Sequence, residues 1–156
     1  MACAGTNDGR APSDCGEGSS RLDSGMPMRF GIGGAHTGRI AMQLGLVGLG
    51  RMGSNIARRA LRAGHECLVY DVSADAVAAM AREGAKGMAS LEALVAALAP
   101  PRPVWMMVPT SRVEDLIAAL APRLADGDVL IDGGNSDYRD DIKRAATLGA
   151  RGIRYL

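Results

Sequence analysis

A glycine-rich stretch with the spacing GxGxxG is the first feature that can do chemistry, and it consists of Gly48, Leu49, Gly50, Arg51, Met52 and Gly53. It follows a short apolar segment and opens a helical pattern, which is the context that a dinucleotide-binding turn requires. In such a turn the first glycine permits the tight bend, the second lets backbone approach a pyrophosphate, and the third allows close packing. Amide groups at the helix start then face the phosphate charge. We therefore predict a pyrophosphate site rather than a glycine-rich turn without a ligand.

Asp71 ends the second predicted strand and can accept hydrogen bonds from the hydroxyls of an adenosine ribose. Its charge would repel the 2′-phosphate of NADP, and no arginine follows it at Val72 or Ser73. We therefore expect NAD to be preferred over NADP, with Arg51 able to give a 2′-phosphate only some help. The alternative is that Asp71 only assists Ser73 in starting the next helix.

A second unusual stretch, IDGGNSDYRD, occupies residues 131–140. Gly133 and Gly134 allow the backbone to bend where an apolar strand ends. Asn135 is then expected to face the cofactor crevice with both a donor and an acceptor. Ser136 is predicted to cap a helix rather than to act as a nucleophile, because no His or Lys base stands near it in sequence. Asp132 is expected to be a structural acid at the strand end, and residues 140–141 a solvated helix face.

Alternating patterns of apolar strands and amphipathic helices place these stretches in a fold. Strands are predicted at residues 43–47, 66–71, 86–88, 104–108, 128–132 and 152–156. The alternation predicts an α/β fold with a Rossmann-type doubly wound parallel sheet and helices on both faces. Right-handed crossovers would place every carboxyl end on one edge, where ligands of such sheets bind. Residues 48–53, 108–110 and 132–136 should therefore meet at that edge.

Serine side chains mark the predicted helix starts. Ser73 and Ser90 are expected to cap the second and third helices, and Ser111 with Glu114 to form a capping box for the fourth. Ser136 is expected to cap a last helix that runs to about residue 148. The first helix should extend from residue 52 to residue 63 and end at a glycine, and its predicted apolar face consists of Met52, Ile56, Ala60 and Leu61.

Composition excludes several classes of function. The chain has 156 residues and a net charge of +1, so no strong field attracts nucleic acid or an anionic membrane. No apolar run approaches the roughly 18 residues of a membrane span, and the N-terminus lacks the pattern of a signal peptide. Three cysteines without metal spacing and two histidines favour a reducing cytoplasm and argue against a metal site.

Residues 1–41 differ from residues 42–156, because Gly, Ser, Asp and Ala dominate them and no periodic apolar face is present. We expect a disordered extension, either sequence upstream of a true start at Met42, which we favour, or a genuine flexible segment. Within it, residues 33–39 have the glycine spacing of a P-loop. Arg39 and Ile40 stand where a P-loop needs Lys and then Ser or Thr, so this segment is predicted to be a loop.

The segments GLVGLGRMGSNIARRALRAGHE, PRPVWMMVP and GDVLIDGGNSDYRDDIKRA resemble the β-hydroxyacid dehydrogenases over residues 42–156. The Asp-Gly-Gly-Asn-Ser core is similar to the 6-phosphogluconate dehydrogenase family among them. The resemblance implies metal-free oxidative decarboxylation of 6-phosphogluconate to ribulose 5-phosphate with NAD(P), in the pentose phosphate pathway and gluconate utilization, by a cytoplasmic homo-oligomer. It also implies that Val108, Pro109 and Thr110 line the dinucleotide, and that Asn135 contacts both nicotinamide and substrate.

Two departures from the family pattern indicate its shorter, NAD-preferring branch: Pro109 stands where Lys is frequent, and Asp71 replaces an Asn-Arg pair of NADP-using members. The family's catalytic Lys and Glu lie beyond the dinucleotide domain, so no catalytic residue is expected among these 156 residues. We therefore expect an incomplete chain without the all-helical catalytic domain, which binds a dinucleotide without turnover. The alternatives are another β-hydroxyacid dehydrogenase, an imine-reducing relative, or a non-catalytic dinucleotide-sensing module.

Overall fold

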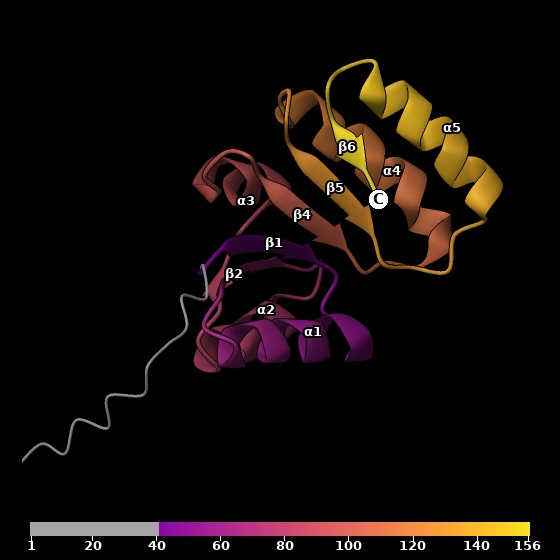
Figure 1. The fold of residues 1–156 in the computed structure, drawn as a ribbon. Coiled ribbons are helices and arrows are strands. Elements are labelled where there is room, and N and C mark those ends of the chain that lie inside the picture. Colours follow the sequence, from indigo (N-terminus) through magenta and orange to yellow (C-terminus); the bar gives the residue numbers. More distant parts are fainter. Residues whose placement is uncertain (1–40) are drawn as a thin grey trace, which may run out of the picture. The chain divides into compact units, whose positions relative to one another are not determined.

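Six parallel strands form one sheet in the order β3-β2-β1-β4-β5-β6. The structure is a computed structural model that describes residues 41–156 (Figure 1). The strands are β1 (Gln43–Val47), β2 (Glu66–Tyr70), β3 (Lys86–Gly87), β4 (Pro103–Met106), β5 (Val129–Asp132) and β6 (Arg154–Tyr155). Strand order reverses between β1 and β4, which confirms the predicted Rossmann-type doubly wound sheet. The P-loop-like segment and nearly all of the predicted extension lie outside the described residues.

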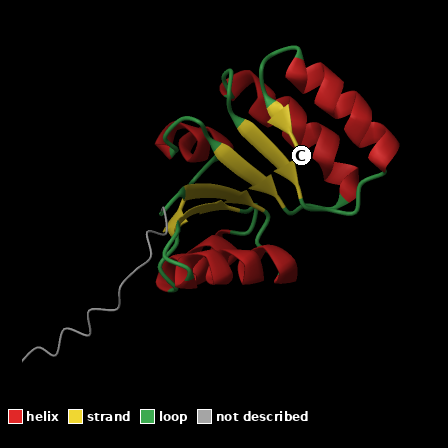
Figure 2. Cartoon of the chain, viewed as in Figure 1, coloured by secondary structure: helices red, strands yellow, loops and turns green. Residues whose placement is uncertain are grey.

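Helices cover both faces of the sheet (Figure 2). They are α1 (Arg51–Arg62), α2 (Ala74–Arg82), α3 (Leu91–Ala97), α4 (Thr110–Leu120) and α5 (Tyr138–Gly149), with a short 3₁₀ turn, η1 (Ala121–Arg123), after α4. The first two pack on one face and the other three on the opposite face, as Figure 1 shows. Right-handed crossovers require this division, because the chain moves outward from β1 in one direction and then from β4 in the other.

Two apolar cores lie on the two faces of the sheet. Leu46 and Val69 face α1 and α2, where Ala57 and Met80 are also buried. Their strand neighbours face the opposite core; Val47, for example, is 3% exposed and packs among residues of α3 and α4. Successive side chains of a strand point to opposite faces, so a strand that is buried on both sides is apolar throughout.

The predicted apolar face of the first helix is confirmed at Ile56, Ala60 and Leu61, which pack against the core on this side of the sheet. Met52 is 65% exposed, whereas Gly53 and Ala57 are buried against the sheet. The predicted face was wrong at Met52, because in the first turn of α1 the neighbouring Gly53 is the residue that packs against the glycine-rich turn. The predicted stop is confirmed: Gly64 adopts φ +85 and its amide donates to Leu61.

Two of the four predicted caps are confirmed. The Ser73 and Ser90 hydroxyls accept hydrogen bonds from the amides of Ala76 (3.3 Å) and Ala93 (3.0 Å). The predicted capping box is wrong, because α4 begins two residues earlier than a Ser111 cap would require and Pro109 occupies its N-cap position. Without that box, Glu114 is free to pair with a side chain of another helix.

Ser136 is the second predicted cap that is wrong. Asp137 caps α5 instead, through a 2.9 Å hydrogen bond from the Arg139 amide to its carboxylate. The Ser136 hydroxyl donates to Asp132 at 2.5 Å. The Ser136 hydroxyl therefore binds a carboxylate at the end of β5 and not the first amides of α5, as the local pattern had predicted.

Five of the six predicted strands are shorter in the structure, and the fourth and the last show why. The strand predicted at residues 104–108 ends at Met106, because Met106 pairs with Val47, the last residue of β1, and the neighbouring strand offers no further partner. Only Arg154 and Tyr155 of the last predicted strand pair with β5. They lie at the sheet edge, where a neighbour exists on one side only.

Asp128 precedes β5 at the edge of the sheet opposite the glycine-rich turn. Its side chain is fully buried and accepts hydrogen bonds from the amides of Arg102 (2.7 Å) and Ala125 (2.8 Å) and from the Arg102 guanidinium (3.0 Å). Burial raises the pKa of this carboxyl, but the hydrogen bonds and the Arg102 charge outweigh burial and hold its pKa below the ordinary value.

We predict that Asp128→Ala lowers the free energy of unfolding at pH 7 by about 3 kcal/mol, because breaking a buried pair leaves Arg102 uncompensated. The contribution of the carboxylate is present above its unfolded pKa of about 3.9 and disappears as pH falls through the lower folded value. Urea unfolding between pH 2 and pH 7 measures both effects. Asp126→Ala, an exposed neighbour, is the control; equal midpoints for the two variants at pH 7 would contradict the prediction.

Candidate dinucleotide-binding site

Three loops meet at the carboxyl edge of the sheet because the strands before them are paired. Val47 of β1 pairs with Met106 of β4, and Met106 pairs with Asp132 of β5. Each of these residues lies at the end of its strand. The register therefore brings residues 48–53, 108–110 and 132–136 to one edge, as the sequence predicts.

The glycine-rich turn is packed too closely for side chains at two positions. Gly48 adopts φ +96, and a β-carbon there would lie 2.4 Å from the Met107 carbonyl oxygen. A β-carbon on Gly53 would lie 1.9 Å from the Gly48 carbonyl oxygen. The first glycine thus makes the turn and the third lets helix α1 contact it, the division of roles that the fingerprint requires.

Gly50 differs from its neighbours because a β-carbon there would meet no atom within 4 Å. It is the N-cap of α1, which has neither a side-chain cap nor an acidic residue in its first turn. The first amides of a helix lack partners inside the helix, and the helix dipole makes this end attractive to anions. The open space beside Gly50 is therefore suited to a phosphate group.

The Asp71 carboxylate joins two loops. One oxygen accepts a 2.6 Å hydrogen bond from the Leu49 amide, and the other accepts a 2.8 Å bond from the Ser73 amide. Asp71 does assist Ser73 at the start of α2, but it also holds the glycine-rich turn. The Leu49 side chain is 6% exposed and belongs to the core, so this residue serves the site through its backbone.

A cleft of about 630 Å³ opens at this edge. Of the predicted site residues, Gly48, Gly50, Asp71, Val108 and Pro109 line it. The rest of the wall was not predicted from the sequence. It consists of Val47, Tyr70, Val72, Leu91, Met107, Arg112, Asp115, Leu116 and Ala119. One feature of the sequence could have indicated that α4 contributes to the wall: Arg112 and Asp115 stand one helical turn apart. Their charged atoms lie 3.8 Å apart in the structure.

The other predicted residues lie around the cleft rather than in its wall: Leu49, Arg51, Met52, Gly53, Thr110 and Asn135. Two of them are joined directly, because the Thr110 hydroxyl donates to the Asn135 carbonyl at 3.1 Å. Gly133 lies against the indole of Trp105, and a β-carbon there would lie 2.2 Å from the indole nitrogen. The loop that carries Asn135 is thus fixed to both β4 and α4.

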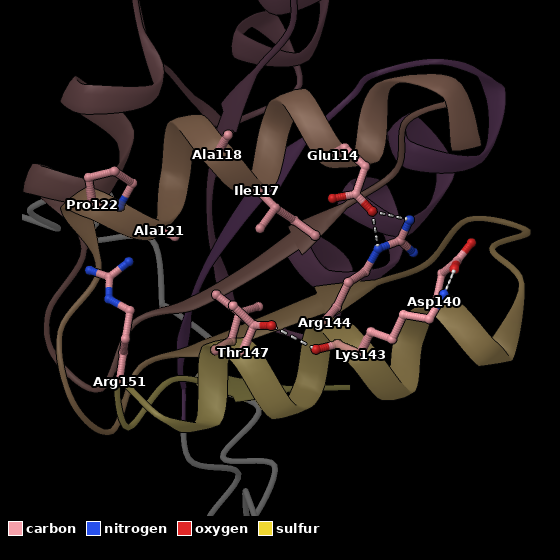
Figure 3. Close-up of a pocket in the computed structure, with 11 residues that line it drawn as sticks. Glu114, Ile117, Ala118, Ala121, Pro122, Asp140, Lys143, Arg144, Thr147 and Arg151 are labelled. Carbon is pink, nitrogen blue, oxygen red and sulfur yellow. Dashed lines mark hydrogen bonds and ion pairs between the residues drawn. The ribbon is translucent and has the colours of Figure 1, made fainter.

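A second cavity, of about 490 Å³, lies between α4 and α5 (Figure 3). None of the predicted cofactor residues lines it. Across residues 41–156, no group of three or more His, Cys, Asp or Glu side chains is placed to hold a metal ion. No helix in the same part of the chain is long and apolar enough to cross a membrane.

Residues 43–156 match the family model described as the NAD binding domain of 6-phosphogluconate dehydrogenase. The chain belongs to this family. An NAD(+)-dependent, decarboxylating 6-phosphogluconate dehydrogenase of Haloferax volcanii is 44% identical over 110 residues, which are 70% of this chain and 37% of that protein. An enzyme of the same description from Bacillus subtilis is 36% identical over 118 residues, 72% of this chain and 25% of that protein. The chain thus spans well under half of either relative.

Solved structures show the same fold. A 6-phosphogluconate dehydrogenase of Plasmodium falciparum, studied with NADP+ and with its substrate, has a TM-score of 0.69 at 25% identity and covers 73% of this chain and 26% of its own. A 3-hydroxyisobutyrate dehydrogenase of Salmonella typhimurium has a TM-score of 0.65 at 26% identity, with coverages of 73% and 40%. The domain is therefore an NAD-binding domain of an oxidoreductase family whose members differ in substrate.

Substitutions at two glycines of the turn test whether it binds a pyrophosphate, and each serves as a control for the other. Gly50→Ala should leave the melting temperature unchanged, because its methyl group enters open space, but should weaken NADH binding about tenfold or more. Gly53→Ala should lower the free energy of unfolding by about 1–3 kcal/mol, because helix and turn must separate. Trp105 is the single tryptophan of the chain, so energy transfer from it to NADH measures binding. Unchanged NADH affinity in Gly50→Ala would remove this turn from the pyrophosphate site.

Proposed function

We propose that residues 42–156 are the cofactor-binding part of an enzyme that oxidatively decarboxylates 6-phosphogluconate to ribulose 5-phosphate, with NAD preferred over NADP. The observation that supports the proposal is the register of β1, β4 and β5, whose last residues pair in turn, so that the glycine-rich turn and the Asn135 loop leave the same edge of the sheet. The names of the relatives from H. volcanii and B. subtilis support the same reaction. Because those proteins are much longer than this chain, the activity is proposed for the whole protein.

The preference for NAD rests on Asp71. Its carboxylate lines the cleft at the end of β2, and each oxygen accepts one backbone hydrogen bond. A carboxylate oxygen has two lone pairs, so capacity remains for the hydroxyls of the adenosine ribose. The 2′-phosphate of NADP would bring negative charge to this carboxylate, at an electrostatic cost of about 1 kcal/mol or more for each unit charge.

Asn135 supplies the proposed contact with nicotinamide and substrate. It is exposed, and the Thr110 hydroxyl holds its carbonyl, so its backbone is fixed while its side chain is accessible. The amide offers two donors and an acceptor, which suit both a carboxamide and the hydroxyls of a sugar acid. We propose that Val108, Pro109 and Thr110 line the dinucleotide between this residue and the glycine-rich turn.

When bound by the glycine-rich turn and Asp71, the nicotinamide cofactor would supply the acceptor for a hydride from C3 of 6-phosphogluconate. The proton of the C3 hydroxyl is lost to a base in the same oxidation. The resulting β-keto acid loses carbon dioxide because the ketone accepts the electron pair, and protonation of the enediol gives ribulose 5-phosphate. The described residues bind and orient the reactants, which lowers the barrier by proximity. We propose that the proton-transfer groups belong to the helical domain that the family resemblance implies.

Cofactor preference provides the first test. We predict that the chain binds NADH about tenfold or more tightly than NADPH, and that Asp71→Asn narrows this ratio by removing the charge. Titration followed by energy transfer from Trp105 measures both affinities. Asp75→Asn, which removes an exposed acid from the first turn of α2, is the matched control. Tighter binding of NADPH by the unmutated chain would reject the role of Asp71.

Substrate choice needs a separate assay on the protein as its source organism produces it. We expect NAD-dependent oxidation of 6-phosphogluconate, with one carbon dioxide and one ribulose 5-phosphate formed for each NADH, as measured by absorbance and product analysis. Oxidation of 3-hydroxyisobutyrate in its place would assign the chain to the other branch represented among the similar structures. NADH binding without turnover of either acid would favour a dinucleotide-sensing role.

A further inference from the structure

A buried group of charged side chains lies beneath the loop that carries Asn135. The side chain of Asp132, the last residue of β5, is 4% exposed, and that of Arg144 in α5 is 8% exposed. Their charged atoms are 3.7 Å apart. Burial of charged groups is costly unless they are paired and hydrogen-bonded. The hydrogen-bond partners of Asp132 and Arg144 therefore identify the segments that these two side chains hold in place.

Two partners of Asp132 belong to the loop. One carboxylate oxygen accepts a 2.9 Å hydrogen bond from the Gly134 amide, and the other accepts a 2.5 Å bond from the Ser136 hydroxyl. These two residues flank Asn135 in sequence. A single carboxylate therefore fixes the chain on both sides of Asn135, while Thr110 holds its carbonyl from the neighbouring loop.

Arg144 connects this carboxylate to the surrounding helices. Its guanidinium donates to Glu114 of α4 at 2.8 Å, as Figure 3 shows, and to Asp141 of its own helix at 2.9 Å. Burial alone would lower the pKa of Arg144, but the hydrogen bonds, that with Glu114 foremost, outweigh it and raise the pKa above the ordinary value. Arg144 therefore stays charged at any physiological pH.

Tyr155 completes the group from β6. Its hydroxyl lies 3.1 Å from an oxygen of Asp132 and 3.1 Å from an oxygen of Asp141, and it can donate to one of them at a time. Burial, together with the neighbouring carboxylates, raises the pKa of Tyr155 above its ordinary value. The hydroxyl therefore keeps its proton. Asp141 pairs with Arg144 while its side chain remains 35% exposed, so the prediction that residues 140–141 form a solvated helix face holds only in part for Asp141.

We propose that Asp132 is a positioning residue that sets the orientation of Asn135, with Arg144 and Tyr155 holding its carboxylate in place. The inference rests on the proposed role of Asn135 in binding nicotinamide and substrate. Two of the hydrogen bonds of Asp132 end on residues 134 and 136, on either side of Asn135. The Tyr155 hydroxyl of β6 and, through Arg144, helices α4 and α5 hold the carboxylate from behind the loop.

The test uses substitutions at Ser136, because removing the Asp132 carboxylate itself can prevent folding. In the whole enzyme, Ser136→Ala should lower kcat for 6-phosphogluconate about tenfold or more, since small displacements of an orienting group are costly. Ser136→Thr retains the hydroxyl and should restore most of the rate. Lys143→Ala removes an exposed side chain from α5, the helix that carries Arg144, and should behave as the unmutated enzyme. Melting temperatures identify any variant that has lost stability.

A double-mutant cycle separates positioning from general stability. If Ser136 acts through Asn135, the effect of Ser136→Ala on kcat should vanish in an Asn135→Ala background. Equal losses in both backgrounds, or an unaltered kcat in the single variant, would overturn the inference.

Amide hydrogen exchange at Gly134, whose amide donates to Asp132, is measured by NMR without ligands and keeps this inference separate from the proposed function. Exchange should be faster in Ser136→Ala than in the unmutated protein and Lys143→Ala, and equal exchange would overturn the inference. An unmutated enzyme that does not oxidise 6-phosphogluconate would refute the proposed function, and the exchange data would still decide whether Asp132 orders the loop.

Discussion

The pairing of β1 with β4 is the constraint on which the site depends. These strands are distant in sequence but adjacent in the sheet, and Val47 lies opposite Met106 where both end. The chain leaves β1 toward one face of the sheet and leaves β4 toward the other, because both crossovers are right-handed. Helices α1 and α4 therefore start on opposite sides of the same edge. The space between their starts is the cleft.

At this edge of the sheet, a few polar groups connect loops that are otherwise independent. Asp71 connects the glycine-rich turn to the start of α2, and Thr110 connects the start of α4 to the Asn135 loop. Hydrogen bonds from amides to a carboxylate are roughly twice as strong as those between neutral groups. Asp71 can therefore order the turn and remain available to a ribose, since its ordering contacts use only part of its acceptor capacity.

Local patterns in the sequence predicted what local physics decides. The alternation of apolar segments gave the element order and the parallel sheet, and Ser73 and Ser90 cap the helices that they precede. The same reasoning was wrong at Ser111 and Ser136, although the local signal was equally good. Ser136 donates to Asp132, across the loop, and Glu114 of the supposed capping box pairs with Arg144 from another helix. Such partners are set by tertiary packing, which a local pattern does not contain. The α4 wall of the cleft was missed for the same reason.

The two acids at the ends of β5 show how the same chemistry serves different purposes. Asp128, before the strand, accepts hydrogen bonds from the amides of Arg102 and Ala125 and closes the edge opposite the cleft. Asp132, at the other end, accepts from the Gly134 amide and the Ser136 hydroxyl of the loop beside the cleft. Amides of the loops at both edges of the sheet need acceptors when they are buried, and a carboxylate supplies several at once. An acid at the edge opposite the cleft can affect only the stability of the fold. An acid at the carboxyl edge also fixes a loop that borders the cleft, as Asp132 does through the Gly134 amide and the Ser136 hydroxyl.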